Sequence, residues 1–156
     1  AMMEGLDLVP IDYVCLGNHE FDNGVAAFAD KLRYYKRGQV INSNCEMDEL
    51  AHLPRWQFIK VGDKTVVVAG VVTGDPSIYT PANLPTTTPI PEALIRTWED
   101  ACAGLGAPPD LYLPMTHQLI KDDHATCQVL AAHPEIAART PVILGGHEHQ
   151  KFVETS

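Results

Sequence analysis

The sequence predicts a single α/β domain over residues 1–156, in which β-strands alternate with α-helices. Short apolar runs bounded by glycine, proline and polar residues recur along the chain, as is typical of buried strands. Longer segments between them repeat apolar side chains at the spacing of one helix face. Because polar motifs directly follow several of these strands, we expect a ligand site at the carboxyl ends of the strands.

The amino-terminal half predicts strands around one helix. In chain order the elements are the end of a helix at 1–8, a strand at 12–16, a helix at 24–36, a short strand at 40–42, and strands at 56–61 and 65–73. The helix is predicted because apolar residues share one helical face, namely Val25, Phe28, Ala29, Leu32 and Tyr35. The last two strands are joined through Gly62-Asp63-Lys64, which predicts a β-hairpin.

The carboxyl-terminal half continues the alternation. Its predicted elements are an irregular loop at 74–91, a helix at 91–104, a strand at 110–115, a helix at 121–134, a buried strand at 141–144 and the start of another strand at 151–156. Proline and threonine dominate the loop, and Pro91 suits the first turn of the helix that follows. Acidic residues open the helix at 121–134, where the helix dipole favours them.

Charge and composition exclude several classes of function. Eleven Lys and Arg residues against 20 Asp and Glu residues give a formal net charge of −9, which argues against a nucleic-acid binder. A small phosphorylated substrate stays compatible, because a bound metal ion outweighs a diffuse negative charge locally. No apolar run is long enough to span a membrane. The four cysteines form no CxxC pair, so we expect reduced thiols and lean weakly to a cytoplasmic location.

Three motifs follow predicted strands and carry side chains suited to a metal ion. They are Gly17-Asn18-His19-Glu20, Thr116-His117 and Gly146-His147-Glu148-His149. Neutral imidazoles and an amide carbonyl are ligands for borderline divalent ions such as Zn²⁺, Mn²⁺ or Fe²⁺. Glycine next to these turns lets the backbone bend sharply and approach an ion. The residues therefore predict a divalent-metal site.

The order and separation of "LGNHEFDNG", "THQ" and "LGGHEH" resemble the last three motifs of the calcineurin-like metallophosphoesterases. The fuller "GNHEFDNG", together with "INSN" at 41–44, is similar to the branch of 5′-nucleotidases and 2′,3′-cyclic phosphodiesterases. The resemblance runs over nearly the whole chain. It implies an αββα sandwich with a centre for two divalent ions, and it does not distinguish Mn, Zn, Fe or Mg.

The resemblance also implies roles for individual residues. The metal ligands that it implies are Asn18, His117 and His147 for one ion and His149 for the other. His19 would face the substrate phosphate, and Asp22 would accept a hydrogen bond from His19 and orient its ring. The implied activity is hydrolysis of nucleotides or related phosphomonoesters or diesters, by a hydroxide generated at two metal ions.

The sequence departs from the family pattern on its amino-terminal side. The family has an earlier Asp-x-His motif and a Gly-Asp motif, which supply the bridging carboxylate, and neither precedes Gly17. Two later segments resemble them, Asp122-Asp123-His124 and Gly74-Asp75-Pro76-Ser77, but one starts a predicted helix and the other lies in the loop. We therefore expect residues 1–156 to be the carboxyl-terminal part of a catalytic domain, inactive or weak alone.

Two other interpretations stay open. The chain could be a catalytically inactive binding or scaffold module, an alternative that the missing upstream motifs favour. An exposed sheet edge could also pair with a second copy, so that a homo-oligomer assembles the site. The remaining histidines are expected to be lone surface residues, namely His52, His124 and His133.

Overall fold

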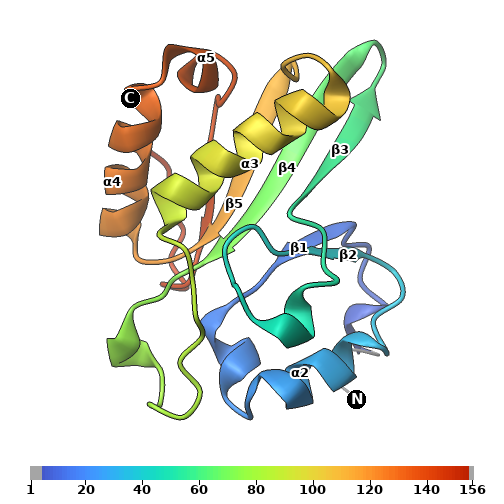
Figure 1. Ribbon diagram of the computed structural model, residues 1–156, viewed down its shortest axis with the longest axis vertical. Coiled ribbons are helices and arrows are strands. Elements are labelled where there is room, and N and C mark those ends of the chain that lie inside the picture. Colours follow the sequence, from blue (N-terminus) through green and yellow to red (C-terminus); the bar gives the residue numbers. More distant parts are fainter. Residues whose placement is uncertain (1–4, 155–156) are drawn as a thin grey trace.

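The computed structural model describes residues 5–154 and contains a two-stranded and a four-stranded β-sheet (Figure 1). The smaller sheet consists of the parallel strands β1 (Tyr13–Cys15) and β2 (Gln39–Ile41). The larger sheet has the order β3-β4-β5-β6, and its strands are β3 (Trp56–Val61), β4 (Lys64–Val72), β5 (Leu111–His117) and β6 (Leu144–Gly146). Only the β3–β4 hairpin is antiparallel. The predicted α/β class is confirmed.

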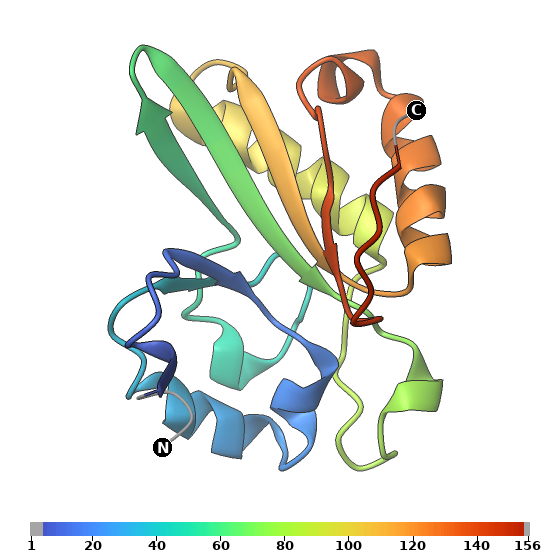
Figure 2. The same cartoon turned by 180° about the vertical axis from the view of Figure 1, so that it is seen from behind.

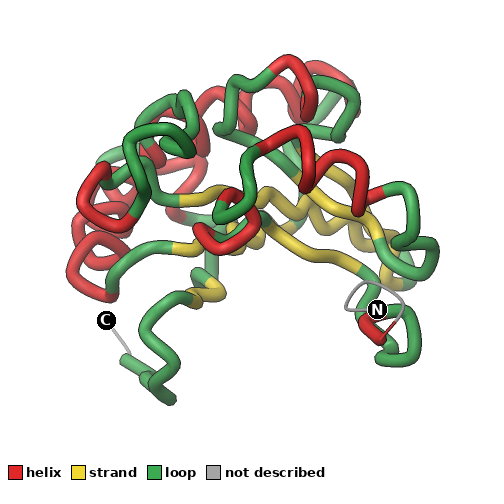
Figure 3. Tube along the Cα trace, turned by 90° about the horizontal axis from the view of Figure 1, so that it is seen from below, coloured by secondary structure: helices red, strands yellow, loops and turns green. Residues whose placement is uncertain are grey.

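Helices α3 and α4 cover one face of the larger sheet, and Figure 2 shows the strands in front of α3 when the molecule is seen from behind. The helices are α2 (Val25–Leu32), α3 (Ile90–Leu105), α4 (Ile120–Ala131) and α5 (Pro134–Ala137), with 3₁₀ turns η1 (Asn18–Phe21), η2 (Asp48–Leu50) and η3 (Pro76–Ile78). From below, most helical segments lie on one side of the strands (Figure 3). Among residues 5–154, none of the helices has the length and apolar character that a membrane crossing requires.

The main core lies between α3 and the larger sheet. Alternate residues of β4 point towards the helix, and Trp98 of α3 packs on Tyr112 of β5 with ring centroids 5.6 Å apart. The buried Tyr112 hydroxyl donates to the Leu94 carbonyl at 2.9 Å, so its polar atom is satisfied. This core fixes where the carboxyl ends of β4 and β5 lie.

The smaller sheet packs against the opposite face of β4, at Gly70. A Cβ atom at Gly70 would lie 2.7 Å from the Ile41 carbonyl oxygen and 2.9 Å from the Cys15 Cβ atom. The two sheets approach this closely only because Gly70 has no side chain. A second core below this contact joins Leu16 and Phe21 to Phe28 of α2. The two-sheet arrangement expected for the sandwich is therefore present, with a short second sheet.

The "INSN" segment at 41–44 joins the two sheets through buried polar groups. The Asn44 side chain accepts from the Val72 amide at 2.9 Å and donates to the Val72 carbonyl at 2.8 Å. The Ser43 hydroxyl accepts the Gly70 amide at 3.0 Å. These contacts replace strand pairing at the end of β4, so the segment supports the site-bearing strands.

Two predicted helices end earlier than expected. The helix predicted over 24–36 ends at Leu32, because the following amides close tight turns, although Tyr35 remains buried. The helix predicted over 121–134 divides into α4 and α5. Pro134 disfavours a helical conformation at the preceding residue, and His133 is extended with φ −108° and ψ 94°.

The last predicted strands are also corrected. The strand predicted as buried over 141–144 lies at Leu144–Gly146 and is exposed, because β6 is the edge strand of the sheet. Residues 151–154 form no strand; the chain runs back beside α4 instead (Figure 2), with Glu154 2.8 Å from His124. Residues 1–4 and 155–156 of the predicted terminal elements lie outside the described part.

Candidate metal centre

Three of the predicted site residues meet at the carboxyl ends of β1, β5 and β6. Asn18 opens η1 after β1, His117 ends β5, and His147 directly follows β6. The Asn18 Oδ1 atom lies 2.8 Å from His117 Nε2 and 3.2 Å from His147 Nδ1, and the two ring nitrogens are 3.3 Å apart. One amide oxygen and two imidazole nitrogens thus form a triangle of electron-pair donors.

The size of this triangle fits one face of a metal coordination shell. Two ligand atoms at bonds of about 2.1 Å are about 3.0 Å apart at a right angle and about 3.4 Å apart at the tetrahedral angle. Two of the three observed separations, 3.2 and 3.3 Å, fall in this range, and the third, 2.8 Å, lies just below it. The donor set of two imidazoles and an amide suits a borderline divalent ion.

Local backbone geometry brings these donors together. His147 has φ 96° and His149 has φ 53°, in the left-handed region that non-glycine residues rarely adopt. The turn is therefore held in place by its surroundings. At the first motif, a side chain on Gly17 would come within 3.0 Å of the His117 ring, so glycine lets the two motifs touch.

The surroundings keep His117 neutral. Burial lowers the pKa of the His117 imidazole to about 4, and positive charge on His147, His19 or His149 acts in the same direction. At neutral pH the ring is therefore deprotonated, which is the form that binds a metal ion.

His19 and Asp22 form a pair at the rim of the site. The His19 Nδ1 atom lies 2.9 Å from Asp22 Oδ2, and both side chains are mostly exposed. The Asn83 side chain donates to the Asp22 carbonyl at 2.8 Å, and Tyr79 packs edge-on against Phe21 with centroids 6.0 Å apart. The loop at 74–89 therefore supports the turn that presents His19.

His149 is not brought into the cluster. Its side chain is exposed and makes no hydrogen bond within residues 5–154. In the same part of the chain, no three side chains of the types His, Cys, Asp and Glu gather to hold a metal ion. The Asn18–His117–His147 group falls short of that number because its third donor is an amide. Among the described residues, these three donors could therefore hold one ion, and no carboxylate joins them.

The later segments that resemble the missing motifs are engaged elsewhere. Asp123 accepts hydrogen bonds from Thr116 at the end of β5 and from Gln118 just after it. Asp75 accepts the Ser77 amide at 2.9 Å and caps η3. Among the residues described, neither carboxylate hydrogen-bonds to His117 or His147, so neither replaces an upstream ligand.

Two carboxylates of the motifs, Glu20 and Glu148, make specific contacts with backbone amides. Glu148 accepts the backbone N–H of Ile120 at 2.7 Å, and Glu20 accepts that of Gly17 at 2.6 Å. The sequence carried a signal only for Glu20, since a glutamate three residues after a turn residue is the capping-box pattern. The Glu148 contact joins residues far apart in sequence, and no local pattern predicts it.

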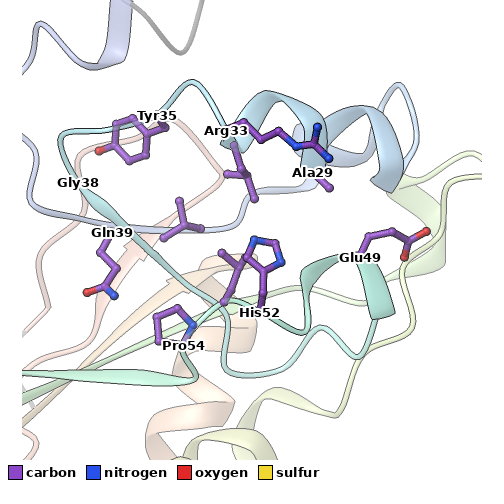
Figure 4. A pocket seen from close by; sticks show the side chains of 11 residues that line it. Ala29, Arg33, Tyr35, Gly38, Gln39, Glu49, His52 and Pro54 are labelled. Carbon is purple, nitrogen blue, oxygen red and sulfur yellow. The ribbon is translucent and has the colours of Figure 1, made fainter.

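A shallow pocket of about 430 Å³ lies elsewhere, between α2, β2 and η2 (Figure 4). Arg33, Gln39, Glu49 and His52 are among its lining residues, and none of the predicted site residues lines it. The pocket is therefore separate from the histidine cluster.

Comparison with known families agrees with the motifs and their geometry. The family described as calcineurin-like phosphoesterase matches residues 2–151. The chain belongs to the calcineurin-like phosphoesterase family. The resemblance predicted from the three motifs is thereby confirmed, and the chain is a member of a family of phosphoester hydrolases. No curated protein matches the chain.

Solved structures share the fold of this calcineurin-like phosphoesterase. A candidate 5′-nucleotidase of Staphylococcus aureus has a TM-score of 0.76 at 21% identity, and 99% of this chain aligns with 32% of that one. The 5′-nucleotidase precursor of Thermus thermophilus has a TM-score of 0.69 at 23% identity, and 88% of this chain aligns with 26% of that one. The sulfate thiohydrolase SoxB of the same species has a TM-score of 0.70 at 17% identity, and 93% of this chain aligns with 29% of that one. The chain thus spans about a third or less of these proteins.

Proposed function

We propose that this chain is part of the catalytic domain of a divalent-metal-dependent phosphoester hydrolase that acts on nucleotides or related phosphate esters. The observation that carries the proposal is the convergence of Asn18, His117 and His147 from three separate strand ends, at separations that fit a coordination shell. Membership of the calcineurin-like phosphoesterase family supports the reaction class.

Each residue of the cluster has a role in this proposal. Asn18, His117 and His147 hold one divalent ion, and His149 contributes to a second when the missing ligands are supplied. Bound divalent ions would supply activation of water and neutralisation of charge on the phosphate. The neutral His117 ring and the buried Asn18 amide need no deprotonation to bind, so the site is ready near neutral pH.

His19 acts on the substrate in this proposal. Its exposed ring, held through Nδ1 by Asp22, leaves Nε2 free to face a phosphate oxygen or the leaving oxygen. Protonated, the ring stabilises negative charge on phosphate and can give a proton to the leaving alkoxide. The Asp22 carboxylate fixes the plane of the ring through its contact with Nδ1.

Nucleotides are the proposed substrates because several solved proteins with the same fold are nucleotidases. Solved structures with the fold include 5′-nucleotidases and a Haemophilus influenzae NAD nucleotidase, the latter with a TM-score of 0.64. The absence of a bridging carboxylate among residues 5–154 and the small share of these proteins that the chain spans support assignment as part of a longer domain.

The test measures hydrolysis and metal content of this chain and of a version extended upstream with an Asp-x-His and a Gly-Asp motif. With Mn²⁺ present, the extended version should hydrolyse p-nitrophenyl phosphate and nucleoside 5′-monophosphates, and this chain alone should be inactive or weak. An extended version that binds no metal and hydrolyses neither substrate would refute the proposal.

A metal-free binding or scaffold module is the second candidate. The lack of a carboxylate beside the two histidines of the cluster, among the described residues, favours it. Elemental analysis of the natural protein separates the two candidates. Stoichiometric metal supports the hydrolase, and a full-length protein that is free of metal and inactive with Mn²⁺ supports the module.

The exposed edge of the larger sheet supports a further proposal about assembly. Strand β6 lies at the edge, with Leu144 and Val142 each about half exposed. Unpaired edges invite pairing with another chain. We expect a homo-oligomer by light scattering, and a strictly monomeric protein at high concentration would contradict it.

A further inference from the structure

The first turn of α4 contacts both histidine motifs of the larger sheet. Asp123 Oδ1 accepts a hydrogen bond from the Thr116 hydroxyl at 2.6 Å and from the Gln118 amide at 2.8 Å. These two residues flank His117 in sequence. The carboxylate therefore fixes the chain on both sides of one proposed metal ligand.

Asp123 also touches the second motif. A Cβ atom on Gly145 would lie 2.6 Å from Asp123 Oδ2, so the backbone of β6 packs directly on this carboxylate. Gly145 precedes His147 by two residues and pairs with Thr116 across the sheet. One side chain of α4 thus sets the spacing of the two strands that end in His117 and His147.

Glu148 makes the reciprocal contact from the second motif to α4. Its carboxylate accepts the Ile120 amide at 2.7 Å, at a helix start whose preceding residue Leu119 provides no side-chain cap. A carboxylate there satisfies a free helical N–H and is favoured by the helix dipole. Glu148 lies between two residues with positive φ, His147 and His149. The contact therefore restrains a turn that is strained on its own.

We propose that Asp123 and Glu148 are positioning residues, which hold His117 and His147 at metal-binding distance by fastening both motifs to the first turn of α4. The inference rests on the proposed metal site, because the two carboxylates act only through its ligands. Without the Glu148 contact, the turn relaxes towards negative φ and His147 Nδ1 moves away from the Asn18 oxygen. Without Asp123, the two strand ends lose their common support.

The experiment titrates Mn²⁺ into this chain and its variants. Glu148→Ala should weaken Mn²⁺ binding about tenfold or more, as the loss of a residue that orients a ligand typically does. Glu148→Gln keeps an acceptor oxygen and should restore affinity to within about threefold. Asp123→Ala should behave like Glu148→Ala, and Asp123→Asn should restore binding because Oδ1 alone accepts both bonds.

A second readout follows the contact itself in the metal-free chain. In ¹H–¹⁵N spectra the Ile120 amide should exchange faster with solvent in Glu148→Ala than in Glu148→Gln. Asp122→Ala is the matched control, since Asp122 lies in the same turn of α4 and its side chain makes no hydrogen bond within residues 5–154. It should leave both Mn²⁺ affinity and Ile120 exchange unchanged.

The outcomes separate this inference from the proposed function. If the unaltered chain binds Mn²⁺ and Glu148→Ala binds it equally well, the positioning role is refuted and the metal site stands. If the unaltered chain binds no Mn²⁺, the positioning role is refuted for these residues, and the proposed function is judged separately on the version extended upstream. Loss of thermal stability in Glu148→Ala with unchanged affinity would mark Glu148 as purely structural and would also overturn the inference.

Discussion

The Nε2 atom of His117 lies 2.8 Å from the Oδ1 atom of Asn18, although the two residues are 99 positions apart in sequence. Asn18 follows β1 of the smaller sheet, and His117 ends β5 of the larger one. The candidate metal centre therefore bridges the two sheets. Its geometry depends on how the sheets pack as well as on the histidines themselves.

Removal of either partner should abolish tight metal binding. Asn18→Ala and His117→Ala should each lower Mn²⁺ affinity by more than about tenfold, since even the loss of a group that only supports a ligand costs about that much. Calorimetric titration with Mn²⁺ measures the change. His52→Ala alters an exposed histidine outside the cluster and should bind like the unaltered chain. Equal affinity in His117→Ala would contradict the site.

His19 and Asp22 should affect turnover without affecting metal binding. In the version extended upstream, His19→Ala should lower kcat by about 100-fold, the lower range for a group that transfers a proton. Asp22→Ala should lower kcat less, because the ring remains and loses only its orienting hydrogen bond. Steady-state kinetics and Mn²⁺ titration are compared on the same samples. A variant of either residue that loses metal would instead place it among the ligands.

The sequence predicted the strand ends because local patterns carry them. The run before Gly17 and the run that leads to His117 are short, continuously apolar and followed by polar residues, as is typical of buried strands. The hairpin of β3 and β4 followed from its turn residues. Since each motif sits just past a strand, a ligand site at the carboxyl ends of the strands was predictable from the α/β class. That the site joins two separate sheets was not.

The supporting contacts of the site could not be predicted in the same way. The bond from Glu148 to the Ile120 amide and the packing of Gly145 on Asp123 join elements distant in sequence. Positive φ at His147 is likewise imposed by the folded surroundings. The exposure of Leu144 depends on which sheet faces are covered, and an apolar pattern does not contain that information. The break at Pro134, by contrast, was readable from the proline itself.

The close contact of the two sheets at Gly70 should be sensitive to a single methyl group. Gly70→Ala places a Cβ atom 2.7 Å from the Ile41 carbonyl, which is backbone and cannot swing away. We expect the free energy of unfolding to fall by about 1–3 kcal/mol through overpacking. Urea unfolding measures this loss, and Mn²⁺ affinity should fall with it as Asn18 shifts from His117.

Gly5→Ala is the matched control for that prediction. A Cβ atom at Gly5 meets no other atom within 4 Å, so the substitution should leave stability and metal affinity unchanged. If Gly70→Ala unfolds at the same urea concentration as Gly5→Ala, the sheets do not pack as closely as described.

The stability of the fold should decline in acid partly through Glu46. Hydrogen bonds from Arg55, and then from Arg96 and Thr88, lower the pKa of the Glu46 carboxyl from 4.5 to about 2. A carboxylate with a depressed pKa in the folded state contributes stability that is complete above its unfolded pKa of 4.5. That contribution is lost as the pH falls from 4.5 towards about 2.

The variant Glu46→Gln tests this dependence because it removes the titrating group and keeps its shape. At pH 6 the unaltered chain should be the more stable in urea unfolding, and its advantage should shrink steadily as the pH is lowered to about 3. Glu49→Gln changes an exposed glutamate that makes no hydrogen bond to the described residues. The difference in stability between this variant and the unaltered chain should therefore not depend on pH in this way. A difference between Glu46→Gln and the unaltered chain that stays constant with pH would mean that Arg55 and Arg96 do not depress the pKa of Glu46.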